Sequence, residues 1–289
     1  MKGFLRNILW ATDFSREGQE ALAYASLFAR KFSAAVTALH VVPDFTPGFY
    51  SDLPAVELEL TRRMEELKKK ALLRLRAAGR QKGLALKKIV IAQGSPAKKI
   101  IETAEKERAD LIVMGKKGQS MIEKILVGSA ATHVLRHSPV PVLVTKRKKK
   151  PTRIKKILLP MDFTKEEKAE RDYGWKLAKG FGASLTLLYV LELYGHDFRL
   201  VNHMFKSALE KFKAKGKEGG RRVGVRREVT KAINAAQGIE DYARTEGFDL
   251  IVMATCVGAL GRLFLGSTTE KVVAHTDVPV FAIPPKYCE

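Results

Sequence analysis

Short apolar runs alternate with longer stretches of helical periodicity along this chain. In the first half, the runs predict strands at 7–11, 35–42, 86–92, 110–114 and 141–145. The stretches between them predict helices at about 16–31, 54–79, 97–107 and 127–137. Because several strand runs are apolar throughout, we expect both of their faces to be buried. The pattern therefore predicts an α/β fold with a mostly parallel sheet and helices on both sides.

The second half of the chain repeats the first. The run Ile157-Leu-Leu-Pro-Met-Asp162 repeats Ile8-Leu-Trp-Ala-Thr-Asp13. Further along, Asp249-Leu-Ile-Val-Met repeats Asp110-Leu-Ile-Val-Met. A period of this length indicates two copies of a whole domain rather than a solenoid.

The domain boundary is predicted from a change in composition. The segment 147–153 carries only basic and polar residues apart from one proline, and it is expected to be the linker. The domains are then 1–146 and 154–289. Each is expected to be a five-stranded parallel sheet with strand order 3-2-1-4-5.

Composition narrows the class of protein only a little. The chain has 289 residues and a net charge of +21, which favours anionic partners such as nucleotides, nucleic acid, acidic lipid or an acidic protein. Two cysteines are too few for a disulfide framework. Neither a signal peptide nor a membrane span is expected, so we predict a cytoplasmic protein.

The strand order places two suggestive positions side by side. Ligands of such sheets bind at the carboxyl ends of the strands, where the strand order reverses. In the order 3-2-1-4-5 this point lies between the first and fourth strands. Asp13 follows the first strand and Gly115 ends the fourth, so we expect both to line one crevice.

The residues after the fourth strand predict a phosphate site. Gly115 and Gly118 allow close backbone approach, and glycine also tolerates a positive φ. Gly128 and Ser129 open the fourth helix, whose free N–H groups favour an anion, while Ser129 caps that helix or donates to phosphate. Lysines 116 and 117 add positive charge nearby. A glycine-rich turn with an ordinary helix cap is the alternative.

The spacing Gly115-x2-Gly118-x9-Gly128-Ser129 resembles the ATP-binding signature of universal stress proteins. The flanking sequence resembles the family as well, from ILWATDFS near the start to Pro139-Val-Pro-Val-Leu-Val at the end of the first copy. The resemblance covers essentially the whole chain as a tandem pair. It implies two Rossmann-like domains of the adenine nucleotide alpha hydrolase-like kind, with ATP, ADP or AMP as ligand.

The resemblance also implies roles for individual residues. Asp13 would lie near the phosphates or bind Mg²⁺, and Val41 would offer its backbone to the adenine edge. Thr132 would supply a further hydroxyl. The phosphates would be held by Gly115, Gly118, Gly128 and Ser129. For Asp13 the alternative is an Asx turn or a helix N-cap, and for Val41 it is a core valine.

The second copy departs from this signature. Ala254 and Val257 stand in place of the first two glycines, and the interval to Gly266-Ser267 is one residue shorter. Ile233 replaces the counterpart of Gly94. Alanine is costly where φ must be positive, and a shorter loop would move the donors. We therefore expect this half to bind ATP weakly or not at all.

These observations predict a nucleotide-responsive stress or signalling module. No general base or arginine finger stands out beside the motif, so a dedicated enzyme is not expected, although the resemblance allows slow ATP hydrolysis. In the family, domains pair through the last strand, which implies an intrachain pseudo-dimer of Val142–Val144 with Val280–Ala282 and allows a homo-oligomer. The alternatives are a basic scaffold for nucleic acid and a regulator of a membrane transporter.

Overall fold

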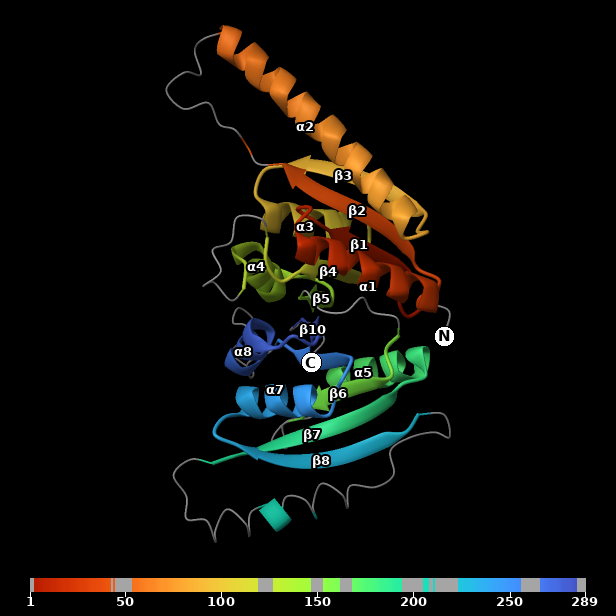
Figure 1. Cartoon of the computed structure of the whole chain (residues 1–289), viewed down its shortest axis with the longest axis vertical. Coiled ribbons are helices and arrows are strands. Elements are labelled where there is room, and N and C mark those ends of the chain that lie inside the picture. Colours follow the sequence, from red (N-terminus) through yellow and green to blue (C-terminus); the bar gives the residue numbers. More distant parts are fainter. Residues whose placement is uncertain are drawn as a thin grey trace.

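The structure of the chain is a computed structural model that describes residues 3–42, 44, 54–118, 127–146, 153–161, 168–193, 205–207, 210, 223–255 and 266–284. Its strands form one ten-stranded sheet (Figure 1). The strands of the first half are β1 (Asn7–Ala11), β2 (Ala35–Val42), β3 (Leu86–Gln93), β4 (Leu111–Gly115) and β5 (Val142–Thr145). Those of the second half are β6 (Lys156–Pro160), β7 (Ser184–Glu192), β8 (Val225–Ala232), β9 (Leu250–Ala254) and β10 (Val280–Ile283).

The strand order confirms the predicted topology in both halves. The sheet runs β3-β2-β1-β4-β5-β10-β9-β6-β7-β8, so each half has the order 3-2-1-4-5. Neighbouring strands within each half are parallel. The halves meet at the one antiparallel pair described, in which Phe281 of β10 lies opposite Leu143 of β5. The predicted pairing of the last strands is therefore present, and it joins two sheets into one.

Helices cover both faces of the sheet. Those of the first half are α1 (Arg16–Phe32), α2 (Pro54–Gln81), α3 (Pro96–Lys106) and α4 (Ser129–His137), and those of the second are α5 (Lys168–Phe181), α7 (Ala235–Thr245) and α8 (Ser267–His275). Residues of α1, α2 and α5 pack in one apolar core, and residues of α3, α4, α7 and α8 pack in another on the opposite face. These two cores confirm the predicted layers.

The predicted element ends of the first half differ from the structure by at most two residues, for example at the start of α4. Its start was expected at about residue 127, but the helix begins at Ser129 because Gly128 is extended, with φ −69° and ψ 146°. The other predicted starts and ends of the first half agree to within two residues. The predicted linker 147–153 stays a prediction, since residues 147–152 lie outside the described part.

The two halves share one continuous core on the α1 side of the junction. The ring of Phe28 in α1 stacks on that of Phe281 in β10, with centroids 6.4 Å apart. It also meets Phe181 of α5 edge-on at 4.9 Å. Phe28 and Phe281 are fully buried. Aromatic side chains bury large apolar areas, so these rings contribute to holding the domains together as well as to each domain's own core.

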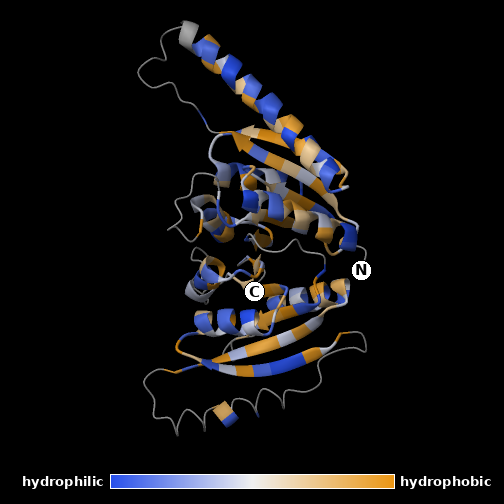
Figure 2. Cartoon of the chain, viewed as in Figure 1, coloured by the Kyte–Doolittle hydropathy of each residue, from blue (hydrophilic) through white to orange (hydrophobic). Residues whose placement is uncertain are grey.

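Helix α2 is longer than the sheet that it covers. Its 28 residues span about 42 Å, whereas the eight residues of β3 span about 26 Å. The helix therefore extends past the sheet (Figure 1), and its surface alternates between apolar and charged residues (Figure 2). Met64, Ala71 and Leu75 are buried, while Leu73 is 64% exposed. Within the described residues, no helix combines the length and hydropathy needed to cross a membrane.

Replacing Phe281 by alanine should lower the free energy of unfolding by about 3–5 kcal/mol, because the change leaves a cavity where the two domains meet. Leu73→Ala, on the exposed face of α2, should change it by no more than about 0.5 kcal/mol. Urea denaturation followed by circular dichroism measures both. Equal effects from the two variants would contradict a shared core at the junction.

Candidate functional site

The carboxyl ends of β1 and β4 lie side by side. The two strands are parallel neighbours, with Ala11 opposite Met114. The chain leaves β1 through Asp13, and it leaves β4 through residues 115–118, here called the motif loop. A methyl group added at Gly118 would lie 2.8 Å from Asp13 Oδ2. The structure thus brings Asp13 and the motif loop together, as the switch-point argument predicted.

The two oxygens of Asp13 have different surroundings. Oδ1 accepts a hydrogen bond from the backbone N–H of Ser15 at 3.0 Å, which is the Asx turn that was the alternative interpretation. Oδ2 is directed toward Gly118. The N-cap of α1 is Ser15, whose hydroxyl accepts from Gly18 N at 3.1 Å, so Asp13 does not cap the helix. One carboxylate oxygen therefore shapes the turn while the other faces the motif loop.

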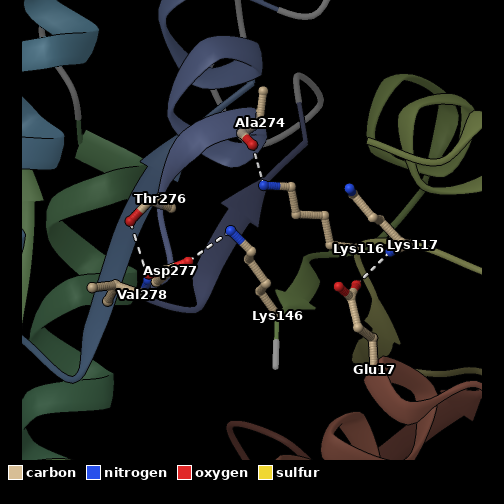
Figure 3. A network of polar contacts seen from close by, with 8 residues as sticks. All are labelled: Glu17, Lys116, Lys117, Lys146, Ala274, Thr276, Asp277 and Val278. Carbon is tan, nitrogen blue, oxygen red and sulfur yellow. Dashed lines mark hydrogen bonds and ion pairs between the residues drawn. The ribbon is translucent and has the colours of Figure 1, made fainter. Parts of the chain in front are cut away.

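The motif loop rests on the first turn of α1. A methyl group at Gly115 would lie 2.9 Å from the backbone carbon of Glu17. The Lys117 backbone N–H donates to Glu17 Oε2 at 2.6 Å (Figure 3), and the Ser15 hydroxyl donates to the Lys117 carbonyl at 3.4 Å. Burial raises the pKa of Glu17, against the opposing effect of the Lys117 hydrogen bond and the nearby lysines. Gly115 is needed because two backbones meet there.

The motif glycines allow close approach, as expected, but they do not use the positive φ that glycine also tolerates. Among the described glycines, positive φ occurs at positions outside the motif, such as Gly94 with φ +124°. The motif glycines are constrained by space instead. Gly118 faces Asp13, and a methyl group at Gly128 would lie 3.2 Å from the Lys116 carbonyl oxygen. A side chain at these positions would occupy the space where the turns meet.

Helix α4 begins beside the motif loop. The N–H of Gly128 donates to the Lys116 carbonyl at 2.9 Å, which closes the loop onto the helix. Gly128 is the N-cap and no side chain caps the helix, so the N–H groups of its first turn are available to an anion. Ser129 is therefore not the cap, and its side chain is exposed. Thr132 is partly buried in the same turn, with its N–H bonded to the Gly128 carbonyl.

Lys116 does not direct its charge at this site. Its side chain is 2% exposed and crosses to the second domain, where Nζ donates to the carbonyl of Ala274 in α8 (Figure 3). Burial, assisted by the nearby Lys146, lowers the pKa of Lys116 to about 8. The expectation that both lysines supply positive charge at the cradle was therefore wrong for Lys116.

Val41 lies at the carboxyl end of β2, which runs past the end of β1. The Leu39 carbonyl accepts from the N–H of Thr12 at 3.0 Å, just after β1 ends. Backbone groups in a strand alternate between its two neighbours, so those of Val41 are directed to the same side, beyond β1. Its side chain is partly buried against the core. The core interpretation and the backbone interpretation of Val41 are thus compatible.

A stack of side chains beside Asp13 was missed by the sequence reasoning. Phe14 has φ +65°, which is strained for a bulky residue. Its ring lies 4.4 Å from the ring of His40 and 4.0 Å from the guanidinium of Arg74, measured to centroids. His40 Nδ1 also lies 2.8 Å from the Thr12 carbonyl oxygen, and burial lowers the pKa of His40. The repeated Asp-Phe pair at 162–163 was the available signal.

The corresponding turn of the second domain is built from different residues. Ala254 ends β9 where Gly115 ends β4. The N–H of Gly266 still donates to the Thr255 carbonyl, at 3.1 Å, in the manner of Gly128. The shorter interval therefore leaves the helix start attached to the strand end, while the expected shift of the loop donors stays a prediction, since residues 256–265 lie outside the described part. Val257 lies outside the described residues.

The second domain also fills the end of β7 with its own groups. A methyl group at Gly238 of α7 would lie 2.6 Å from the side chain of Val190, the counterpart of Val41. Glu192 Oε1 accepts from the N–H of Ala235 at 2.6 Å, so a carboxylate already occupies the start of α7. Ile233 is 68% exposed and replaces Gly94 without a positive φ. The end of β7 is thus occupied by groups of the second domain itself.

The described residues contain no group of three or more His, Cys, Asp or Glu side chains that could hold a metal ion. The nearest resemblance is the pair His133 and His137 on α4, whose rings stack with centroids 4.2 Å apart. His137 Nδ1 lies 2.9 Å from the His133 carbonyl oxygen, which gives the ring a local structural partner.

Comparison with known proteins agrees with this geometry. The model of the universal stress protein family matches residues 5–146 and again residues 153–284. Since these matches cover most of the chain, the chain belongs to the universal stress protein family, in a tandem form.

Some relatives match one half of this chain, and others match nearly all of it. A universal stress protein of Methanocaldococcus jannaschii is 37% identical over 148 residues, spanning 50% of this chain and 84% of that protein. Another, from Thermus aquaticus, is 33% identical over 145 residues, spanning 49% of this chain and 98% of the relative. A solved universal stress protein from Archaeoglobus fulgidus has a TM-score of 0.67 at 25% identity and covers 97% of both chains. A universal stress protein solved in complex with cAMP has a TM-score of only 0.36, too low to indicate the ligand of this chain.

Gly115→Ala should lower the free energy of unfolding by about 1–3 kcal/mol, because the methyl group meets the backbone of α1, which cannot rotate away. Gly118→Ala should cost no more than about 0.5 kcal/mol, since the Asp13 carboxylate that it meets can rotate. Denaturant unfolding of the two variants checks this order. A larger loss for Gly118→Ala would show that the close approach to α1 is not what requires glycine.

Proposed function

We propose that this universal stress protein binds ATP in its first domain and acts as a nucleotide-responsive stress or signalling module. The observation that carries the proposal is the meeting of Asp13, Gly118 and Gly128 at the carboxyl ends of β1 and β4. Asp13 is more than a hundred residues from Gly118 and Gly128 in the sequence, so the sheet brings two distant segments together here. Two of the three residues contribute no side chain, which leaves backbone N–H groups for an anionic ligand.

The phosphates are assigned to the motif loop and the start of α4. The N–H groups of the first turn of α4 follow Gly128, and the positive end of the helix dipole favours negative charge there. The exposed hydroxyl of Ser129 stands at the same helix start, and Thr132 follows within the turn. In this assignment Gly115 does not contact the phosphates itself, but it allows the motif loop to pack against α1.

Asp13 is the proposed Mg²⁺ ligand. Mg²⁺ in nucleotide sites is commonly held by one or two carboxylates together with phosphate oxygens and water, so it needs no cage of protein ligands. The Oδ2 atom of Asp13 faces the motif loop, whereas Oδ1 is engaged by Ser15. The adenine is assigned to the backbone of Val41, which is directed past the end of β1.

The second domain is proposed to bind ATP weakly or not at all. The supporting observations are the close packing of α7 on Val190 and the carboxylate of Glu192 at the start of α7. Both lie at the carboxyl end of β7, the counterpart of the β2 end to which the adenine is assigned in the first domain. Slow hydrolysis by the first domain is compatible with the proposal, which does not make the protein a dedicated enzyme. Cytoplasmic location stays a prediction.

ATP titration by calorimetry should show one site per chain. Gly128→Glu should weaken binding by about tenfold or more, because it places a carboxylate where the phosphates are expected. The matched control is Gly266→Glu, which makes the same change at the same helix position of the second domain and should leave the affinity unchanged. Two equivalent sites in the wild type, or equal losses in both variants, would contradict the proposal. Nucleic-acid binding that is steeply salt-dependent and equal in both would favour a basic scaffold.

Asp13→Asn should reduce the gain in ATP affinity that Mg²⁺ provides over EDTA, because the amide is a poorer ligand for this cation. The matched control is Asp241→Asn, which removes a surface carboxylate of α7 that pairs with Arg244. Competition titrations with a fluorescent ATP analogue, with and without Mg²⁺, measure the difference. An unchanged Mg²⁺ effect in Asp13→Asn would remove Asp13 from the proposed metal site.

A further inference from the structure

The side chain of Lys116 connects the motif loop to the other domain. Its ammonium group donates to the carbonyl of Ala274, one residue before α8 ends at His275 (Figure 3). The last four carbonyls of a helix have no partner within it, and a cation is favoured there by the helix dipole. Lys116 therefore satisfies an acceptor of the second domain that would otherwise need water.

The backbone of the same residue holds the first domain's side of the site. Its N–H donates to the Thr145 carbonyl at 2.8 Å, and its carbonyl accepts from Gly128 at 2.9 Å. Lys116 is thus bonded to β5, to the N-cap of α4 and to the C-terminal turn of α8. Any shift of the motif loop that moves this residue must disturb at least one of these bonds.

Two further contacts cross between the domains beside it. Lys146 pairs with Asp277 at 2.7 Å, and Arg136 of α4 pairs with Glu270 of α8 at 3.4 Å. Together with the Lys116 bond they form what we call the charged seam. In all three the cation comes from the first domain and the acceptor from the second. The seam is therefore asymmetric, with cations on the first domain and acceptors on the second, although the two domains are copies of one fold.

The duplication explains why the reverse contacts do not form. The positions that correspond to the three cations are Thr255, Ala274 and Pro284. Thr255 keeps its hydroxyl within its own domain, bonded to the Ile283 carbonyl at 3.2 Å. Two first domains paired in the same way would lack the acidic partners of Lys146 and Arg136. The second domain thus supplies contacts that a second copy of the first would not.

We propose that Lys116 is a positioning residue for the ATP site, through which the second domain holds the motif loop in the conformation that accepts nucleotide. This inference rests on the proposed function of the first domain. It gives the second domain a role that needs no ligand of its own. The coupling must also act in the other direction: if the end of α8 stabilises the nucleotide-binding form of the motif loop, bound nucleotide stabilises the contact with the end of α8 by the same free energy.

The charges around Lys116 determine how firmly it is held. Lys146 and Lys117 repel it, while Glu17 and Asp277 attract it. Lys116 also acts to lower the pKa of Glu240 in α7, but burial and the neighbouring Asp241 raise the pKa of that carboxyl to about 7. Lys116 is thus a buried cation, here called the anchor, and desolvation is the main effect that opposes its charged form.

Lys116→Met tests the proposal because it removes the ammonium group and keeps an apolar side chain of similar length. In the full chain we expect ATP affinity to fall by about fivefold or more. The matched control is Lys146→Met, which removes a cation from the same seam but not from the motif loop. Its partly exposed ion pair should change ATP affinity by no more than about twofold. Equal losses in the two variants would mean that domain docking in general, not Lys116, supports the site.

Hydrogen exchange distinguishes a positioning role of Lys116 from a purely structural one, because only the positioning role predicts that ATP changes exchange in α8. ATP should slow exchange in the last turn of α8 in the wild type and in Lys146→Met, but not in Lys116→Met. Persistent protection of α8 in Lys116→Met would overturn the proposal. Without nucleotide, Lys116→Met alone should speed exchange in both the motif loop and the last turn of α8. If the wild type binds no ATP, the proposed function fails, and this ligand-free comparison still decides whether Lys116 is the anchor.

The pH dependence of stability checks the burial of the ammonium group independently. The unfolded chain keeps the Lys116 proton up to about its ordinary pKa of 10.5, whereas the folded chain loses it near pH 8. Between these values the unfolded state binds more protons, so the free energy of unfolding should rise with pH more steeply in the wild type than in Lys116→Met. Parallel profiles would show that Lys116 is not buried as a cation.

Discussion

The antiparallel pairing of β5 with β10 is the constraint on which the rest of the molecule depends. It joins two parallel half-sheets, and it places α1 beside α5 on one face and α4 beside α8 on the other. The first face is closed by aromatic rings around Phe28 and Phe281. The second combines an apolar core with the directed polar contacts of the charged seam. Apolar packing tolerates either partner, whereas the charged seam distinguishes them, so the duplicated domains are not interchangeable.

Within the first domain, close packing of backbones shapes the candidate site. Gly115 lets the motif loop lie on α1, and Gly128 lets α4 begin against the Lys116 carbonyl. Asp13 then meets Gly118 because β1 and β4 are neighbours. These glycines serve close approach, as expected, and none of them has a positive φ.

Much of the fold could be predicted from the sequence because buried parallel strands are apolar throughout and helices keep their 3.6-residue period. The strand order followed from the doubly wound pattern of strands and helices, and the meeting of Asp13 with the loop that begins at Gly115 followed from that order. The destination of the Lys116 side chain could not be predicted in this way. A lysine within a glycine motif is compatible with a phosphate or with a distant carbonyl, and no periodicity distinguishes them. The strained turn at Phe14 was missed for the same reason.

The sequence by itself determined the two domains, their strand order, the residues of the candidate nucleotide site and the loss of its glycines from the second copy. These properties follow from the local pattern of apolar and polar residues and from the internal repeat, so they can be predicted without knowing which distant residues make contact. Only the tertiary structure decided that Lys116 serves the second domain, that Ser15 rather than Asp13 caps α1, and that the seam is directional. Those outcomes depend on which side chains meet across the junction, and such meetings follow from packing in three dimensions.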